Sequence, residues 1–192
     1  MIAVFAIEQL GVGNTAALGP AGCMTTAQLK NSLKFELKQA TQLPPGYTLQ
    51  CQKIELFQAF SVYAPKTLTT SDIMGTVAQD NSILVIANDE TMNGTAHPAS
   101  PDQRVIQDTK LITPELMKQM NSRYITINGN PAWVRDAGDY GTQTVKFSNG
   151  TIISTEKTHA PARLDLYIGN TTYVIVADRP SEYLIKIAES IR

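Results

Sequence analysis

The stretch from Arg163 to Arg192 reads RLDLYIG, then NTTYVIVAD, then RPSEYLIKIAESIR. Apolar and polar residues alternate on both sides of a Gly-Asn-Thr segment, a pattern that predicts an antiparallel hairpin. Its two-residue turn is either Gly169-Asn170 or Asn170-Thr171. Both registers bury the same apolar set, because side chains alternate along a strand. That set comprises Leu164, Leu166, Ile168, Tyr173, Ile175 and Ala177.

A short amphipathic helix follows the hairpin. Its apolar stripe, at positions i, i+3, i+4 and i+7, consists of Leu184, Ile187, Ala188 and Ile191. A single two-stranded ribbon with one helix is not stable alone in water. We therefore expect this helix to cover a larger sheet to which earlier strands also belong.

Upstream, residues 25–40 (TTAQLKNSLKFELKQA) are predicted to form an N-terminal amphipathic helix. Leu29, Leu33 and Leu37 recur every four residues, which places them on one side. Thr25 or Thr26 can cap the start, and the Leu-Pro-Pro-Gly segment at 43–46 ends the helix.

The rest of the chain mainly predicts strands. Residues 47–63 predict two, with Tyr47, Leu49 and Cys51 on one face, and the apolar run 82–87 predicts another, buried on both faces. Thr113-Pro114-Glu115 begins a short middle helix. The expected fold class is α+β: a curved antiparallel β-sheet with an N-terminal amphipathic helix, a short middle helix and a C-terminal helix packed on it.

A chain of 192 residues suits a single domain, 1–192. Residues 1–22 form an apolar segment with a Gly-rich lead-in, and 43–192 form the sheet-forming body with a polar loop at 88–103. The apolar run Ile2 to Ile7 has two interpretations. It is a first strand or apolar tail docked on the core, or the end of a trimmed signal peptide or membrane anchor.

Cys23 and Cys51 are the two cysteines of the chain. A bond between them would tie the start of the first helix to the sheet and indicate an oxidising compartment. Two separate buried thiols are the other interpretation. Possible glycosylation sites at Asn93, Asn149 and Asn170 all fall in predicted turns, where a glycan is tolerated. Together these features favour an extracytoplasmic location, at the cell surface or secreted.

The charge of the chain argues against a nucleic-acid partner, and its apolar runs are too short to cross a membrane. A formal net charge of -1, without any long run of Lys or Arg, argues against nucleic acid. No stretch reaches the roughly 20 apolar residues that cross a bilayer. In the polar loop, the acidic and histidine side chains match no metal motif, so we expect no metal and no cofactor. These residues are Asp89, Glu90, His97 and Asp102.

Catalytic constellations are missing from the sequence patterns. His97 and His159 are the two histidines, and neither has a partner at ligand spacing. Asp136 and Asp139 lie in a Gly-rich segment, where acids usually serve as turn residues. We expect no catalytic residue and no enzyme; a hydrolase that uses either histidine is the alternative.

Two segments resemble a family of extracytoplasmic domains of unknown function. Leu43-Pro-Pro-Gly-Tyr47 resembles the family's Leu-Pro-x-Gly-Tyr entry, and Ser181 to Ser190 (SEYLIKIAES) resembles its closing helix. The Ile127-Asn128-Gly129 turn stands where the family has an asparagine-glycine turn. The resemblance covers about Leu43 to Ile191, except for residues 64–120, which do not align.

Members of this family commonly stand outside the membrane, behind an anchor or an anti-sigma-factor segment. The family is distantly similar to lipoprotein-carrier and sigma-regulator sensor domains, whose curved sheets surround a hydrophobic concavity. The resemblance therefore implies a membrane anchor upstream of residue 1 and supplies no catalytic motif. It is a likeness of fold, which is a weak basis for function.

We therefore expect a non-catalytic extracytoplasmic binding or sensor-type domain, the soluble part of a membrane-anchored or secreted protein, with an unknown ligand or protein partner. This hypothesis predicts a disulfide between Cys23 and Cys51. It also predicts a concave sheet face or a helix–sheet cleft lined with aliphatic residues. The alternative is a structural or assembly subunit of a cell-surface complex, which needs an interface in place of a pocket.

Overall fold

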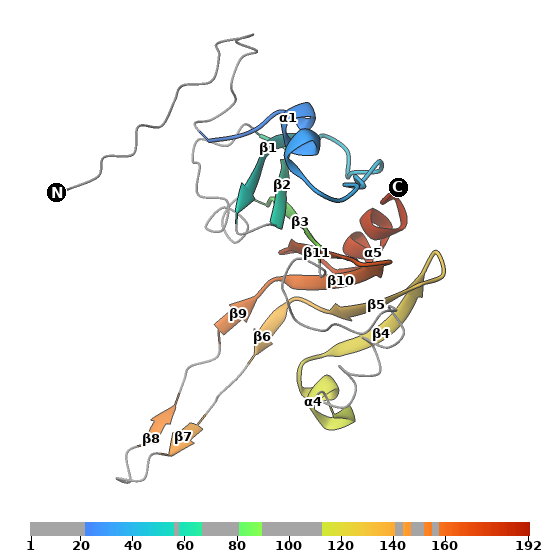
Figure 1. Cartoon of the computed structure of the whole chain (residues 1–192). Coiled ribbons are helices and arrows are strands. Elements are labelled where there is room, and N and C mark those ends of the chain that lie inside the picture. The colour runs from blue at the N-terminus through green and yellow to red at the C-terminus, as the bar shows by residue number, and fades with distance from the viewer. Residues whose placement is uncertain are drawn as a thin grey trace, which may run out of the picture.

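The computed structural model describes residues 22–55, 58–66, 81–89, 113–140, 144–146, 152–154 and 158–192. Its centre is a seven-stranded sheet that is not closed, with strand order β1-β2-β3-β11-β10-β5-β4 (Figure 1). All neighbouring strands in it run antiparallel. The strands are β1 Thr48–Glu55, β2 Gln58–Ala64, β3 Ile83–Asp89, β4 Ser122–Ile127, β5 Asn130–Arg135, β10 Ala162–Ile168 and β11 Thr171–Ala177. This sheet and its helices confirm the α+β antiparallel class.

Two further strand pairs lie outside the main sheet. β6 Gly138–Tyr140 pairs with β9 Thr158–Ala160, and β7 Thr144–Lys146 pairs with β8 Ile152–Ser154. Because β6 follows β5 and β9 precedes β10, the β6–β9 pair prolongs these two strands beyond the sheet (Figure 1).

The hairpin of β10 and β11 lies in the middle of the sheet. Ile168 pairs with Thr171, so the turn is Gly169-Asn170, the first of the two predicted registers. Gly169 has a φ of 56°, which favours glycine at that position. The predicted apolar face is confirmed, since five of its six residues are buried in the main core and Ile168 packs against it.

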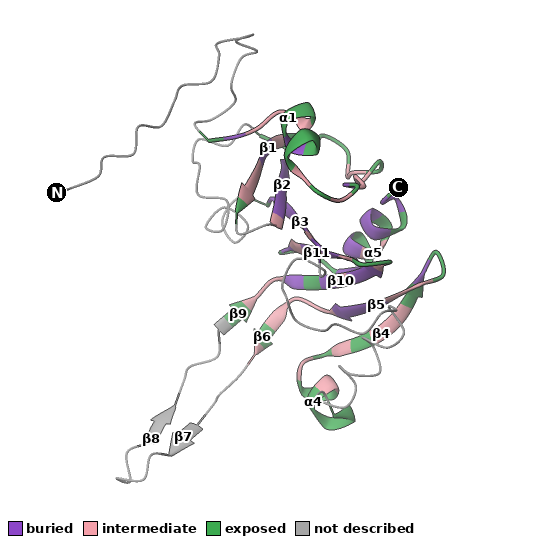
Figure 2. Cartoon of the chain, viewed as in Figure 1, coloured by how far each residue is buried: buried purple, intermediate pink, exposed green. Residues whose placement is uncertain are grey.

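Helix α5, Ser181–Glu189, covers this face of the sheet and contacts β10, β11 and β4. Figure 2 shows buried residues along its inner side. Leu184, Ile187 and Ala188 are buried as predicted. Ile191 is also buried, but it lies beyond the helix and forms an isolated β-bridge with Ala40. The apolar stripe therefore joins the helix and the chain after it to one core.

The predicted helix over 25–40 is wrong in its second half. Helix α1 is Thr26–Ser32, with a capping box between Thr25 and Gln28, and the backbone is extended at Leu33. The Ser32 hydroxyl donates to the Gln28 carbonyl at 2.9 Å, a bond that competes with helical geometry. The four-residue spacing alone therefore predicted a helix that is too long.

After α1, the backbone forms hydrogen bonds with distant residues that a continued helix would not form. The backbones of Gln39 and Arg192 exchange two hydrogen bonds, of 3.2 and 3.3 Å. The amide of Lys38 donates to the hydroxyl of Tyr173 at 3.0 Å. Leu37 is still buried in the same core as Leu29. The apolar spacing thus predicted the burial of Leu37 but not its backbone conformation.

Strand β1 contains a bulge that overturns a predicted face. Leu49 pairs with Tyr63 and Cys51 pairs with Val62, so one extra residue, Gln50, stands in β1. Leu49 and Cys51 therefore project to opposite faces: Leu49 is 41% exposed, whereas Cys51 is buried. The prediction that Tyr47, Leu49 and Cys51 share a face is wrong because alternation breaks at a bulge.

Two boundaries also shift. The polar loop does not begin at residue 88, because Asn88 and Asp89 belong to β3 and pair with Thr172 and Thr171 of β11. The middle helix is confirmed as α4, Pro114–Gln119, with Thr113 as its cap. In the parts of the chain that the structure describes, no helix is long and apolar enough to span a bilayer.

The sheet has a buried cluster on each face. The larger cluster joins it to α1 and α5. The smaller one, on the opposite face, consists of Cys23, Cys51, Phe60, Val62, Ala64 and Leu84. The larger core thus fixes α5 against the sheet, and this contact positions the site described next.

Candidate binding pocket

A cavity of about 200 Å³ opens where α5, the sheet and the loop before β1 meet. Aliphatic side chains from three elements line it: Ile83 from β3, Ala177 from β11, and Leu184 and Ile187 from α5. The cavity is a helix–sheet cleft, and its sheet and helix sides are aliphatic.

The loop side of the pocket is a tight turn. The amide of Tyr47 donates to the carbonyl of Pro44 at 3.1 Å, and Gly46 has a φ of 84°. Proline followed by a glycine of positive φ is the pattern of a type II turn, here Pro45-Gly46. Pro44, Pro45 and Tyr47 all line the pocket. The Leu-Pro-Pro-Gly-Tyr segment and the C-terminal helix, which are far apart in the sequence, therefore meet at one cavity.

A guanidinium and a phenol form its polar side. Arg179 Nη2 donates to Tyr47 Oη at 3.3 Å. The Tyr47 hydroxyl in turn donates to the carbonyl of Asn81 at 2.6 Å. Since a carbonyl can only accept and a guanidinium can only donate, these roles are fixed. Arg179 is the one charged residue among the described residues that line the pocket, and it forms no ion pair within the described part of the chain.

A second polar cluster surrounds His159, on β9. Its Nδ1 lies 3.3 Å from Asp139 of β6, and its Nε2 lies 2.9 Å from Asp178, in the turn between β11 and α5. These hydrogen bonds, that to Asp178 first, raise the pKa of His159 above its usual 6.5. The side chain is 54% exposed. His159 therefore bridges β9 to β6 through Asp139 and joins the β6–β9 pair to the end of β11 through Asp178.

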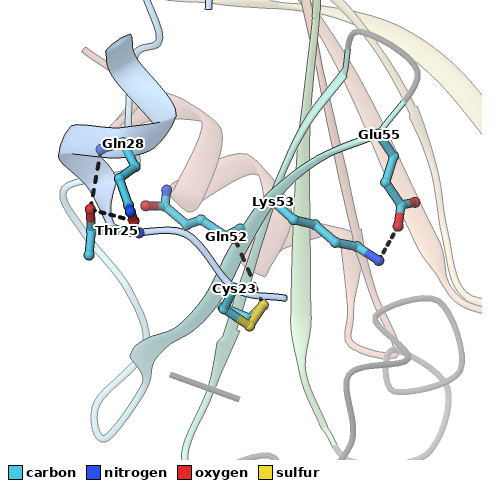
Figure 3. Close-up of a disulfide and its surroundings, with 7 residues drawn as sticks. Cys23, Thr25, Gln28, Gln52, Lys53 and Glu55 are labelled. Atoms are coloured by element: carbon cyan, nitrogen blue, oxygen red, sulfur yellow. Dashed lines mark hydrogen bonds and ion pairs between the residues drawn. A yellow bond between two sulfur atoms is a disulfide. The ribbon is translucent and has the colours of Figure 1, made fainter. Parts of the chain in front are cut away.

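The disulfide between Cys23 and Cys51 is formed, with 5.2 Å between the Cα atoms. Figure 3 shows Cys23 beside Gln52 of β1, just before α1. The Met24 amide donates to the Gln52 carbonyl at 2.6 Å, and the Thr26 hydroxyl donates to the Gln52 side chain at 2.8 Å. The bond thus fixes the start of α1 to the sheet, as predicted.

The other predicted site residues have varied positions. Asn170 is exposed in the β10–β11 turn, whereas Asn93 and Asn149 lie outside the described residues, as do Glu90, His97 and Asp102. Asp136 does not pair with Asp139; it accepts hydrogen bonds from Arg123 and Asn121. Among the residues that the structure describes, no cluster of three or more His, Cys, Asp or Glu could hold a metal ion.

Sequence reasoning missed the cluster and the composition of the pocket. The partners of His159 are 20 and 19 residues away and belong to other elements. No local spacing signals them.

Comparison with protein-family models, with curated proteins and with solved structures finds no match for this chain.

Proposed function

We propose that this protein is a non-catalytic binding domain of an extracytoplasmic compartment, and that the pocket between the Leu-Pro-Pro-Gly-Tyr turn and α5 is its binding site. The pocket carries the proposal. It combines an apolar lining with a few convergent polar groups, the usual composition of small-molecule sites. The two segments that resemble the extracytoplasmic family both contribute to it, which supports a sensor or ligand-binding role.

The disulfide supports the location. It is well buried, with Cys23 8% and Cys51 7% exposed, and such bonds persist mainly in oxidising compartments. A membrane anchor upstream of residue 1, a curved sheet around a concavity and glycosylation at Asn170 belong to the same proposal.

The alternative role, a structural or assembly subunit, requires an apolar interface. Among the described residues, the large exposed hydrophobic side chains are Leu49, Leu116 and Tyr183, which come from three different elements. Tyr183 already lines the pocket. A stable oligomer that covers the pocket would favour assembly over ligand binding.

Native mass spectrometry of the protein from its own host tests the proposed role. We expect an intact disulfide and a bound small molecule. The variant Tyr183→Ala should lose that molecule, because Tyr183 lines the pocket and is 48% exposed, so its removal spares the core. Leu49→Ala, at a position outside this pocket that is 41% exposed, should retain it. Protein with free thiols and no ligand would contradict the proposal.

A further inference from the structure

We propose that the pocket recognises the carboxylate of a small apolar molecule, such as a short-chain fatty or aryl acid, with the Arg179 guanidinium as its anchor. The inference rests on the proposed binding function and specifies its ligand class.

The permanent positive charge of Arg179 favours an anionic ligand. An arginine side chain stays protonated at every physiological pH and carries five N–H donors in a planar fork. A single hydrogen bond, to Tyr47, is formed by the Arg179 side chain within the described residues. That bond orients the guanidinium and leaves donors for a bidentate partner. Carboxylates fit such a fork.

The neighbouring acid does not neutralise this charge. Asp178 directly precedes Arg179 in the chain, but its carboxylate accepts a hydrogen bond from His159 at 2.9 Å. No acidic residue is among the described residues that line the pocket. A positive site in a partly enclosed cavity attracts an anion and repels an amine.

The lining of the pocket is mostly apolar. Ile83, Leu184 and Ile187 form the closely packed base of the cavity. Its accessible walls come from Pro44, Pro45 and the half-exposed Tyr183. A ligand that fills the cavity therefore needs an apolar body beside its charged group. The volume of about 200 Å³ lies below the usual range for drug-sized ligands, about 300–1,000 Å³, which limits the body to a short chain or one ring.

The single charge of Arg179 favours a monoanion over a dianion. One guanidinium balances one negative charge, whereas a phosphate monoester brings nearly two. The second charge would remain unpaired beside an apolar wall, which is unfavourable. A monoanionic carboxylate is therefore the best match for this combination of charge and lining.

Titrations of the folded protein with hexanoate, hexan-1-ol, hexylamine and hexyl phosphate, followed by amide NMR shifts, test the inference. We expect hexanoate to shift the amides of Tyr47, Arg179 and Leu184 and to bind about tenfold tighter than hexan-1-ol. Hexylamine should be excluded. The preference for hexanoate over hexan-1-ol should disappear in Arg179→Gln and persist in the control Arg192→Gln, at an exposed arginine outside the pocket.

A measurement on the unaltered protein guards against a variant that fails to fold. Added salt should weaken hexanoate binding and leave hexan-1-ol binding unchanged, because only the former depends on charge. Equal affinities for the acid and the alcohol would reject the carboxylate but leave the pocket as a binding site. Tighter binding of hexyl phosphate would assign the site to phosphates instead. If none of the four probes shifts the amide signals of the pocket residues, the proposed function is rejected as well.

Discussion

His159 occupies a position that only its charged form satisfies. Both ring nitrogens face carboxylates, Asp139 and Asp178, and carboxylates can only accept hydrogen bonds. A neutral imidazole donates through one nitrogen and would direct a lone pair at the other carboxylate. The charged groups around the ring are these two acids, with Arg179 next along the chain. Protonation of one residue therefore holds the β6–β9 pair to the turn before α5.

The stability of the protein should depend on pH through this residue. The pKa of His159 is raised in the folded state, so its contribution is complete below the usual value of 6.5 and is lost as pH rises through the higher folded value. Urea denaturation across that window should show falling stability. The loss should be small and screened by salt, because the side chain is exposed.

Two variants separate this effect from other titrations. His159→Ala should flatten the pH dependence, and Asp178→Asn, which removes the carboxylate 2.9 Å from the ring, should weaken it. An identical decline in the wild type and His159→Ala would show that the two ion pairs do not matter.

Gly46 is the residue on which the pocket turn depends. Its φ of 84° disfavours any side chain, although a Cβ there would meet no atom within 4 Å. Gly46→Ala should therefore destabilise the protein through backbone strain alone, by about 1–2 kcal/mol. Gly138→Ala is the control, because Gly138 has no positive φ and its Cβ would meet Tyr140 at an ordinary 3.6 Å. Urea midpoints measure both, and equal effects would argue against the turn assignment.

At the level of elements, local patterns predicted what local interactions determine. The β10–β11 hairpin and α5 follow from alternation, a glycine turn and a helical stripe, and all are confirmed. The helix over 25–40 was wrong because its second half pairs with residues about 150 positions away: Gln39 with Arg192, and Ala40 with Ile191. The alternation of apolar and polar residues in this segment does not reveal the bulge at Gln50. The pocket depends on the docking of α5 against the turn, which no single segment encodes.

The disulfide is the covalent link between elements, and its removal has a calculable cost. Cys23 and Cys51 are 28 positions apart. On the chain-entropy model, a loop of that length stabilises the fold by about 3–4 kcal/mol. The double variant Cys23→Ala, Cys51→Ala should lose about that much in urea denaturation. Reductant should destabilise the wild type equally and leave the double variant unchanged; an unchanged wild type would contradict this.

On the scale of the whole molecule, the sequence predicted the class but not the strand order. Alternation shows which segments are strands, whereas their neighbours depend on the complete assembly. The C-terminal hairpin lies between β3 and β5, so each half of the sheet pairs with a strand that comes later in the chain. No turn signal in the sequence reveals that this hairpin lies between two earlier strands.

That strand order has a consequence for synthesis on the ribosome. As the chain emerges from its N-terminus, β1 to β3 and later β4 and β5 appear with one edge each that has no partner yet. Both edges close only when β10 and β11 emerge, after all the other strands of this sheet. Open strand edges invite association with other chains. The nascent protein therefore keeps two strand edges open until β10 and β11 are made. A chain released by a ribosome that stalls before residue 162 would be prone to aggregate.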